Sequence, residues 1–220
     1  MAVAIAGAVA MSLLGAGAAN AASKATLNVV HGIPGVNVNV CVNGAKAIAD
    51  FKPGDVVTGV KLPAGSYDLK VVAQADSCSG PAILQANGVA LKAGRNYTAV
   101  ANLNASGTPK LSLFRNDVRP VREGKARLTV RHTADAPAVN VWANGTRLIG
   151  GTSFAWGESA TLAVPKGIYA AWVSLPGTYR PVIGPAVLKL RSGVAYQVYA
   201  WGNATDGYGL AVVATAVGTK

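Results

Sequence analysis

The sequence is poor in the residues that build most catalytic and metal centres. Its 220 residues include only two cysteines, two histidines and nine acidic residues, and only 13% of them are charged. Two histidines and two cysteines supply too few ligands for a typical zinc site or metal cluster. The scarcity of cysteine also excludes a small domain held together by many disulfides. We therefore expect neither a metal nor another cofactor.

Apolar residues and glycine are abundant instead. Hydrophobic residues make up 51% of the chain, which is too many for an intrinsically disordered protein. The 26 glycines and 11 prolines provide frequent turns, and 20 basic residues give a net charge of +11. This composition is typical of a basic, β-rich globular protein with one or two domains.

Residues 1–21 carry no charge and have the features of a signal peptide. An apolar run from Ala2 to Leu14 precedes small residues, and Ala19-Asn20-Ala21 fits the small-x-small pattern of a signal peptidase site. A membrane anchor is the alternative, but the apolar run is shorter than the roughly 20 residues that span a bilayer. We expect cleavage before Ala22 and a secreted or cell-envelope protein whose mature chain has no transmembrane anchor.

Export would place Cys41 and Cys78 in an oxidising compartment. When a protein in such a compartment has only two cysteines, they usually form one disulfide. A disulfide that closes a loop of 36 intervening residues would contribute about 3 to 4 kcal/mol of stability. Two free thiols are the alternative, although neither a Cys-x-x-Cys spacing nor an adjacent histidine indicates a redox role.

Three stretches of the sequence occur twice in the same order. His31–Gly44 (HGIPGVNVNVCVNG) resembles His132–Gly145 (HTADAPAVNVWANG), Leu62–Val71 resembles Val164–Val173, and Leu91–Tyr97 resembles Leu190–Tyr196. A spacing of about 100 residues is too long for a solenoid repeat, so each copy should fold around its own core. We predict two tandem domains, residues 25–117 and 118–220.

Apolar residues alternate with polar or small ones inside each copy. Val36, Val38, Val40 and Val42 form such a run, which is typical of a half-buried strand. Asn-Gly pairs follow at residues 43–44 and 144–145, where they favour type I′ hairpin turns. Short strands with regular turns, about seven or eight per copy, predict an all-β fold of two antiparallel β-sandwiches.

The order of these motifs resembles a known family. Leu27–Gly32 (LNVVHG), the alternating valine run and Leu62–Tyr67 (LPAGSY) are similar to the exported bacterial family known as domain of unknown function 4397. Lys125–Ala134 is similar to its two-copy actinobacterial members. The resemblance covers nearly the whole mature chain and implies immunoglobulin-like or transthyretin-like sandwiches at or outside the cell surface. The family has no established activity, so the resemblance assigns no functional residue.

Basic residues gather where the two copies join. Between Phe114 and His132 lie Arg115, Arg119, Arg122, Lys125, Arg127 and Arg131, against only two acidic residues. Strand alternation predicts that Arg127 and Arg131 face outward together. We hypothesise a patch that binds an anionic polymer such as teichoic acid, acidic polysaccharide or extracellular DNA. The alternative is a solvated linker and an edge strand protected by its charges. No nucleic-acid-binding motif accompanies these residues, so we expect no specific nucleic-acid partner.

All four tryptophans belong to the second copy. The outward strand positions hold Trp142, Trp172, Tyr199 and Trp201. Such a set can form a stacking platform for sugar rings. Two alternatives are packing against the first copy or another chain, and an apolar layer beneath a loop.

Evidence for catalysis is weak in this sequence. His31 and His132 occupy equivalent positions, and without a nearby second ligand we favour histidines bonded to a turn over a metal or proton site. No Gly-x-Ser-x-Gly motif is present, and the acidic residues are scattered. We therefore expect a non-enzymatic, exported binding or structural module of the cell envelope. Its alternatives are a spacer or protein-interaction scaffold with no small ligand and, third, a carbohydrate-binding module.

Overall fold

Alternating apolar residues produce strands along most of the chain that the structure describes. The computed structural model describes residues 23–150 and 154–220, so the predicted signal peptide lies outside the described residues. The first half contains β1 (Lys24–Gly32), β2 (Val38–Val42), β3 (Ala45–Phe51), β4 (Val56–Pro63), β5 (Gly65–Ala73), β6 (Leu84–Leu91), β7 (Asn96–Leu103) and β8 (Pro109–Asn116). The second half contains β9 (Lys125–His132), β10 (Asn140–Ala143), β11 (Thr146–Ile149), β12 (Ser159–Pro165), β13 (Gly167–Ser174), β14 (Pro181–Leu190), β15 (Val194–Asn203) and β16 (Gly207–Ala216).

The strands form four sheets with a repeated order. The first half gives β4-β1-β7-β8 and β3-β2-β5-β6, and the second half gives β12-β9-β15-β16 and β11-β10-β13-β14. The prediction of an all-β protein with two β-sandwiches is therefore confirmed. The sheets are not purely antiparallel, however, because β1 pairs with β7 and β9 with β15 in parallel. Two neighbouring strands can run in the same direction when the chain between them passes through the opposite sheet. A tight hairpin, in contrast, forces an antiparallel pair.

The predicted hairpin turns have the expected backbone geometry. Asn43 and Gly44 have φ angles of 49° and 80°, and Asn144 and Gly145 have 47° and 80°. A type I′ turn needs positive φ at both central residues, which Asn and Gly adopt at low cost. These turns set the registers of the hairpins β2–β3 and β10–β11.

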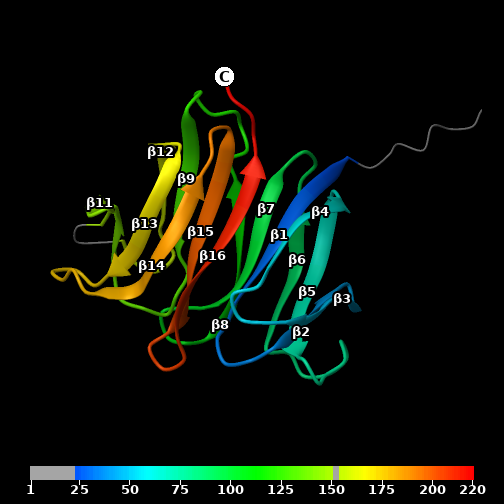
Figure 1. The fold of residues 1–220 in the computed structure, drawn as a ribbon. Coiled ribbons are helices and arrows are strands. Elements are labelled where there is room, and N and C mark those ends of the chain that lie inside the picture. The colour runs from blue at the N-terminus through cyan, green and yellow to red at the C-terminus, as the bar shows by residue number, and fades with distance from the viewer. Residues whose placement is uncertain (1–22, 151–153) are drawn as a thin grey trace, which may run out of the picture.

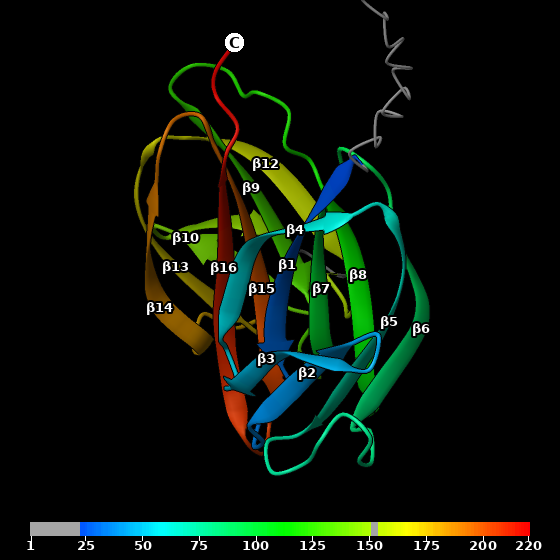
Figure 2. The ribbon, with the colours of Figure 1, turned by 90° about the vertical axis from the view of Figure 1, so that its right-hand side faces the viewer.

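The two sandwiches stack on each other to give four layers (Figures 1 and 2). Sheet β4-β1-β7-β8 faces sheet β12-β9-β15-β16, and a cluster of buried side chains fills the space between them. It contains Val30 and Val100 from the first sandwich and Tyr199, Ala211 and Val213 from the second. Every residue of β7 is consequently buried, on both faces of its sheet.

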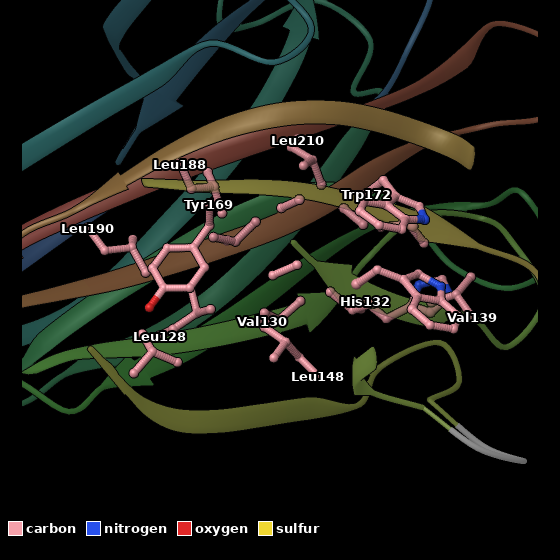
Figure 3. A pocket seen from close by; sticks show the side chains of 18 residues that line it. Leu128, Val130, His132, Val139, Leu148, Tyr169, Trp172, Leu188, Leu190 and Leu210 are labelled. Atoms are coloured by element: carbon pink, nitrogen blue, oxygen red, sulfur yellow. The ribbon is translucent and has the colours of Figure 1, made fainter. Parts of the chain in front are cut away.

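The hydrophobic cores of the two sandwiches differ. One continuous cluster fills the second sandwich, and Figure 3 shows Leu128, Val130 and Leu188 among its closely packed side chains. The buried side chains of the first sandwich form two separate clusters instead. One contains Val38 and Phe51, and the other contains Leu27 and Leu69.

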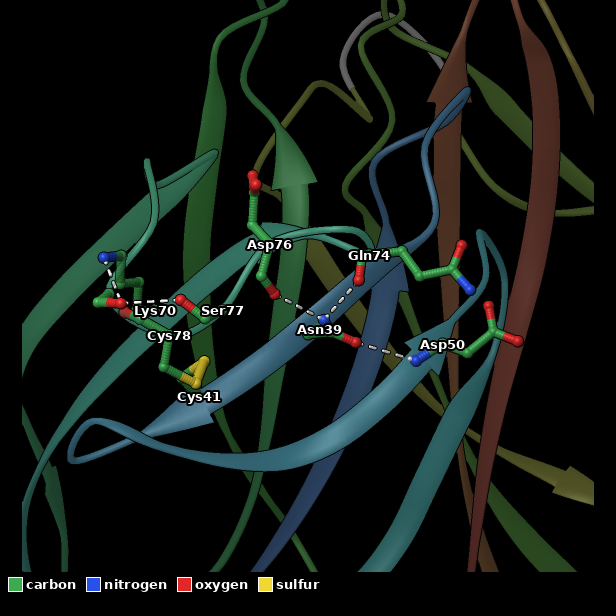
Figure 4. Close-up of a disulfide and its surroundings, with 9 residues drawn as sticks. Asn39, Cys41, Asp50, Lys70, Gln74, Asp76, Ser77 and Cys78 are labelled. Carbon is green, nitrogen blue, oxygen red and sulfur yellow. Dashed lines mark hydrogen bonds between the residues drawn. A yellow bond between two sulfur atoms is a disulfide. The ribbon is translucent and has the colours of Figure 1, made fainter.

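A disulfide joins Cys41 to Cys78, as predicted (Figure 4). It links β2 to the loop that follows β5, with the two Cα atoms 5.9 Å apart. The same loop is also held by the Asn39 side chain, whose amide nitrogen donates to the carbonyl oxygens of Gln74 (2.9 Å) and Asp76 (3.1 Å). The loop is therefore fastened to the outer sheet by covalent and polar contacts together.

Candidate functional site

The segment between β8 and β9, residues 117–124, is the place where both sandwiches and the C-terminal residues meet. The backbone nitrogen of Val121 donates to the carbonyl of Gly218 (3.1 Å), and that of Lys220 donates to the carbonyl of Val121 (2.9 Å). We name residues 117–124 the junction segment; it lies beside the C-terminus in Figure 1. Because its backbone is bonded in this way, its arginines project from a fixed support.

An open groove of about 430 Å³ runs along one side of the junction segment. The turn before β7 contributes Arg95, the end of β8 contributes Arg115, and the junction segment contributes Asp117 and Arg119. Arg95 and Arg115 are exposed to solvent. The groove therefore presents several guanidinium groups to a ligand in solution.

A second open groove, of about 400 Å³, lies on the other side. Arg119, Arg122 and Arg127 line it, together with Lys220 and residues of β12. Arg119 borders both grooves, and its side chain is 84% exposed. The two grooves thus form one basic surface with Arg119 at its centre, which we name the junction grooves.

Asp117 is the one acidic residue among the described residues that line the junction grooves. Its carboxylate accepts hydrogen bonds from the Arg119 side chain at 2.8 and 2.9 Å and lies 3.4 Å from Nε of Arg127. These contacts, the hydrogen bond from Arg119 first, lower the pKa of Asp117 to about 2. Asp117 therefore stays ionised and paired with Arg119 and Arg127. It orients Arg119, and it does not act as an isolated negative charge that would repel an anionic ligand.

Arg127 has a structural as well as an electrostatic role. Its Nη1 atom donates to the carbonyl oxygens of Asp117 (3.1 Å) and Arg119 (2.7 Å), and only 14% of its side chain is exposed. Arg127 therefore holds the junction segment in place. Lys125, at the start of β9, is half-buried and does not line either groove.

Arg131 departs from the predicted surface patch. It takes the outward strand position as expected, but the first sandwich covers that position and leaves the residue 5% exposed. Its Nη1 atom donates to Asn116 Oδ1 (2.9 Å) and to the Tyr199 hydroxyl, and its guanidinium lies 4.5 Å from the centre of the Phe114 ring. The prediction that Arg131 faces a polymer in solution is wrong, because this residue binds the two sandwiches together.

Sequence reasoning missed two members of the junction grooves, Arg95 and Lys220. Arg95 belongs to the first copy's β6–β7 turn, and the pairing of Tyr97 with Arg115 in β7–β8 brings it close to Arg115. Lys220 reaches the site through the backbone bonds to Val121. No local motif surrounds either residue, so only strand register and chain folding could reveal them.

The four outward aromatic residues do not form one exposed surface. Tyr199 is fully buried between the sandwiches, where its ring centre lies 5.9 Å from that of Phe114. Trp201 packs in the same interface against Gly54, where an added Cβ atom would come within 2.8 Å of the indole. Packing between the two copies, one of the three interpretations, is therefore correct for these two residues.

Trp142 and Trp172 lie on the opposite side of the second sandwich. Their rings stack with centres 6.0 Å apart, and the Trp142 indole donates to the Ser174 hydroxyl (2.9 Å). Tyr179, from the loop after β13, lies over Trp142 with ring centres 4.6 Å apart, and Trp142 is only 6% exposed. A loop therefore covers Trp142, and the predicted common aromatic surface for a ligand is wrong.

The two histidines are bound to turns, as expected. The ring Nε2 atoms of His31 and His132 lie 2.9 Å from the carbonyl oxygens of Val36 and Pro137, respectively. Burial lowers the pKa of both rings, more than these hydrogen bonds raise it. Among residues 23–150 and 154–220, no group of three or more His, Cys, Asp or Glu side chains is placed to hold a metal ion.

The described part of the chain contains no helix that is long and apolar enough to cross a membrane.

Comparison with known proteins identifies the family. No curated protein matches the sequence. A model of the family described as Domain of unknown function (DUF4397) matches residues 25–142, which include the first sandwich except Lys24, all of β9 and most of β10. Since this match covers more than half of the sequence, the chain belongs to the DUF4397 family.

Proposed function

We propose that this protein is an exported, non-enzymatic module that attaches to an anionic polymer of the cell envelope through the junction grooves. The observation that carries the proposal is the meeting of two open, arginine-lined grooves at Arg119. Their acidic residue, Asp117, is already paired. A long anionic ligand can therefore cross the junction segment and meet basic side chains on both sides.

The chemistry of arginine suits phosphate and carboxylate groups. A guanidinium donates two parallel hydrogen bonds to either group, which gives orientation as well as attraction. Single exposed ion pairs contribute only about 0 to 1 kcal/mol. A polymer with repeated charges, such as teichoic acid, can contact several arginines at once, and the linked contacts increase the overall affinity.

Two further observations support export. The Cys41–Cys78 disulfide is typical of proteins in oxidising compartments. Residues 1–21 have the composition of a signal peptide. The non-enzymatic role is supported by the histidines, whose Nε2 atoms are engaged by backbone carbonyls.

The proposal can be tested by co-sedimentation with purified cell walls that contain teichoic acid. We expect the wild-type mature chain to sediment with the walls at low ionic strength and to be released by salt, because salt screens exposed charges. The triple variant Arg115→Gln/Arg119→Gln/Arg122→Gln should bind at least about tenfold more weakly.

A matched control separates the grooves from the overall charge. The variant Lys52→Gln/Lys166→Gln/Lys189→Gln also removes three exposed positive charges, but from positions outside both grooves. It should bind like the wild type if the junction grooves are the site. Equal weakening by both triple variants, or retention that salt does not affect, would overturn the proposal.

A structural spacer is the second candidate. The observation that favours it is the buried interface in which Arg131 bonds to Asn116 and to Tyr199, because such an interface makes the two sandwiches one rigid unit. A spacer would bind envelope proteins and no polymer. Salt-independent capture of an envelope protein, with no sedimentation on protein-free walls, would favour this role.

A further inference from the structure

The first sandwich contains an apolar cavity whose direct counterpart in the second sandwich is much smaller. The space between β1, β2, β5 and β7 has a volume of about 200 Å³, whereas the corresponding space in the second sandwich has about 30 Å³. Both spaces are lined by residues at equivalent strand positions, such as Leu27 and Leu128. The two spaces can therefore be compared position by position.

One substitution in the cavity wall contributes to this difference. Ala99 faces the cavity from β7 and pairs with Val29 of β1, while Val198 occupies the same place in β15 and pairs with Val130 of β9. The smaller side chain leaves space between the two buried clusters of the first sandwich. An unfilled space of this size destabilises a core, so an occupant would be favourable.

The cavity wall is almost entirely apolar. Valine, leucine, isoleucine, alanine and phenylalanine side chains line it, with His31 as the polar exception among the described lining residues. Both ring nitrogens of His31 have partners, Nε2 at the Val36 carbonyl and Nδ1 at the Ile33 amide. The cavity therefore offers no hydrogen bond to a ligand inside it and suits a hydrocarbon group.

The cavity opens between the edge strands β3 and β4. Lining residues on β5 and β7, such as Leu69 and Ala99, are buried, whereas Ala47 on β3 is exposed and Val57 and Val60 on β4 are half-buried. The pairing of β3 with β2 is also interrupted by two register shifts. An apolar group can therefore enter from this edge without passing through a continuous sheet.

The shape of the cavity favours a chain over a ring. The residues that face it along β1 are Leu27, Val29 and His31, which span about 13 Å at about 3.3 Å per strand residue. We propose that the first sandwich binds an unbranched alkyl chain in this cavity, held by apolar contacts with the two facing sheets.

Octanoate is a suitable probe for this site. Titration of the mature, disulfide-bonded protein should produce saturable chemical-shift changes in the methyl groups of Val29, Val40 and Leu69, followed by methyl NMR. Octanol should bind in the same place, since the alkyl chain supplies the contacts inside the cavity.

Variants of the cavity supply the decisive test. Ala99→Val, which copies the second sandwich, should weaken octanoate binding at least tenfold. The exposed substitution Ala214→Val makes the same chemical change on β16 and should have no effect on binding. If Ala99→Val fails to fold, Ala47→Phe would block the opening without changing the buried core and should weaken binding similarly.

The proposal fails if octanoate causes no saturable change in the wild type. It also fails if both Ala99→Val and Ala47→Phe bind octanoate as the wild type does. Neither result depends on the junction grooves, because the cavity and the grooves share no lining residue. Polymer binding and alkyl-chain binding can therefore be judged separately.

Discussion

In the first sandwich, the loop after β5 is joined to β2 by the Cys41–Cys78 disulfide, whereas in the second the loop after β13 packs through Tyr179 on Trp142 of β10. The positions correspond, since Cys41 pairs with Lys70 in β2–β5 and Trp142 pairs with Trp172 in β10–β13. In both sandwiches the same loop is fastened to the outer face of the outer sheet. In the first sandwich this attachment is a covalent bond, and in the second it consists of contacts between aromatic rings.

Equivalent loops of one architecture can therefore be held by a covalent bond or by aromatic packing. A disulfide acts mainly by limiting the conformations of the unfolded chain, so its effect depends on the oxidation state. Aromatic packing acts in the folded state through buried apolar area and ring contacts, so it is independent of reductant. The two halves of the chain should therefore respond differently to reduction and to truncation of aromatic side chains.

The largest expected effect is removal of the disulfide. The double variant Cys41→Ala/Cys78→Ala should lower the free energy of unfolding by about 4 kcal/mol, because the closed loop spans a sequence separation of 37 residues. Urea unfolding followed by far-UV circular dichroism measures the loss, and reduction of the wild type is the control. A loss below about 1 kcal/mol would show that Asn39 and its backbone contacts hold the loop without the disulfide.

Trp142→Ala should have the next largest effect, a loss of about 3 kcal/mol, because a buried indole and its hydrogen bond to Ser174 disappear. Tyr179→Ala should cost only about 1 kcal/mol, since Tyr179 is 74% exposed. Neither loss should change when the protein is reduced. If Trp142→Ala were as mild as Tyr179→Ala, aromatic packing would not be the counterpart of the disulfide.

The difference in packing between the two cores predicts two smaller effects on the free energy of unfolding. Val198→Ala should lower the free energy of unfolding by about 2 kcal/mol, because it opens a cavity in a closely packed core. Ala99→Val should be neutral or stabilising, since the extra methyl groups enter existing space. Thermal unfolding of both variants measures the pair. Destabilisation by Ala99→Val would mean that the space in the first sandwich cannot accept a side chain.

The two histidines should produce the smallest effect on stability. It is a pH dependence to which both sandwiches contribute. Burial lowers the pKa of His31 and of His132 from the ordinary value of 6.5. The unfolded chain therefore takes up protons as the pH falls through 6.5 while the folded rings stay neutral, so this part of the stability is complete above pH 6.5 and declines below it. Urea unfolding on both sides of pH 6.5 tests this expectation. His132→Asn should make the decline shallower, and an unchanged pH dependence would contradict the assignment.

The sequence by itself determined the features that depend on neighbouring residues. Valine alternation predicted β2, the Asn43-Gly44 pair predicted the turn after it, and both agree with the structure. The disulfide was also predictable, because Cys41 and Cys78 are the only cysteines in the chain. These inferences rest on local backbone preferences and on composition, which do not depend on how distant elements pack.

Only the tertiary structure decided what covers each strand face. Alternation correctly placed Arg131 and Tyr199 outward, but docking of the sheet that contains β1 and β7 buried both. Strand register likewise brought Arg95 beside Arg115 and set Ala99 opposite Val29, which created a groove and a cavity without a local motif. Burial and cavity volume arise from contacts between segments far apart in sequence, so a pattern of neighbouring residues cannot encode them alone.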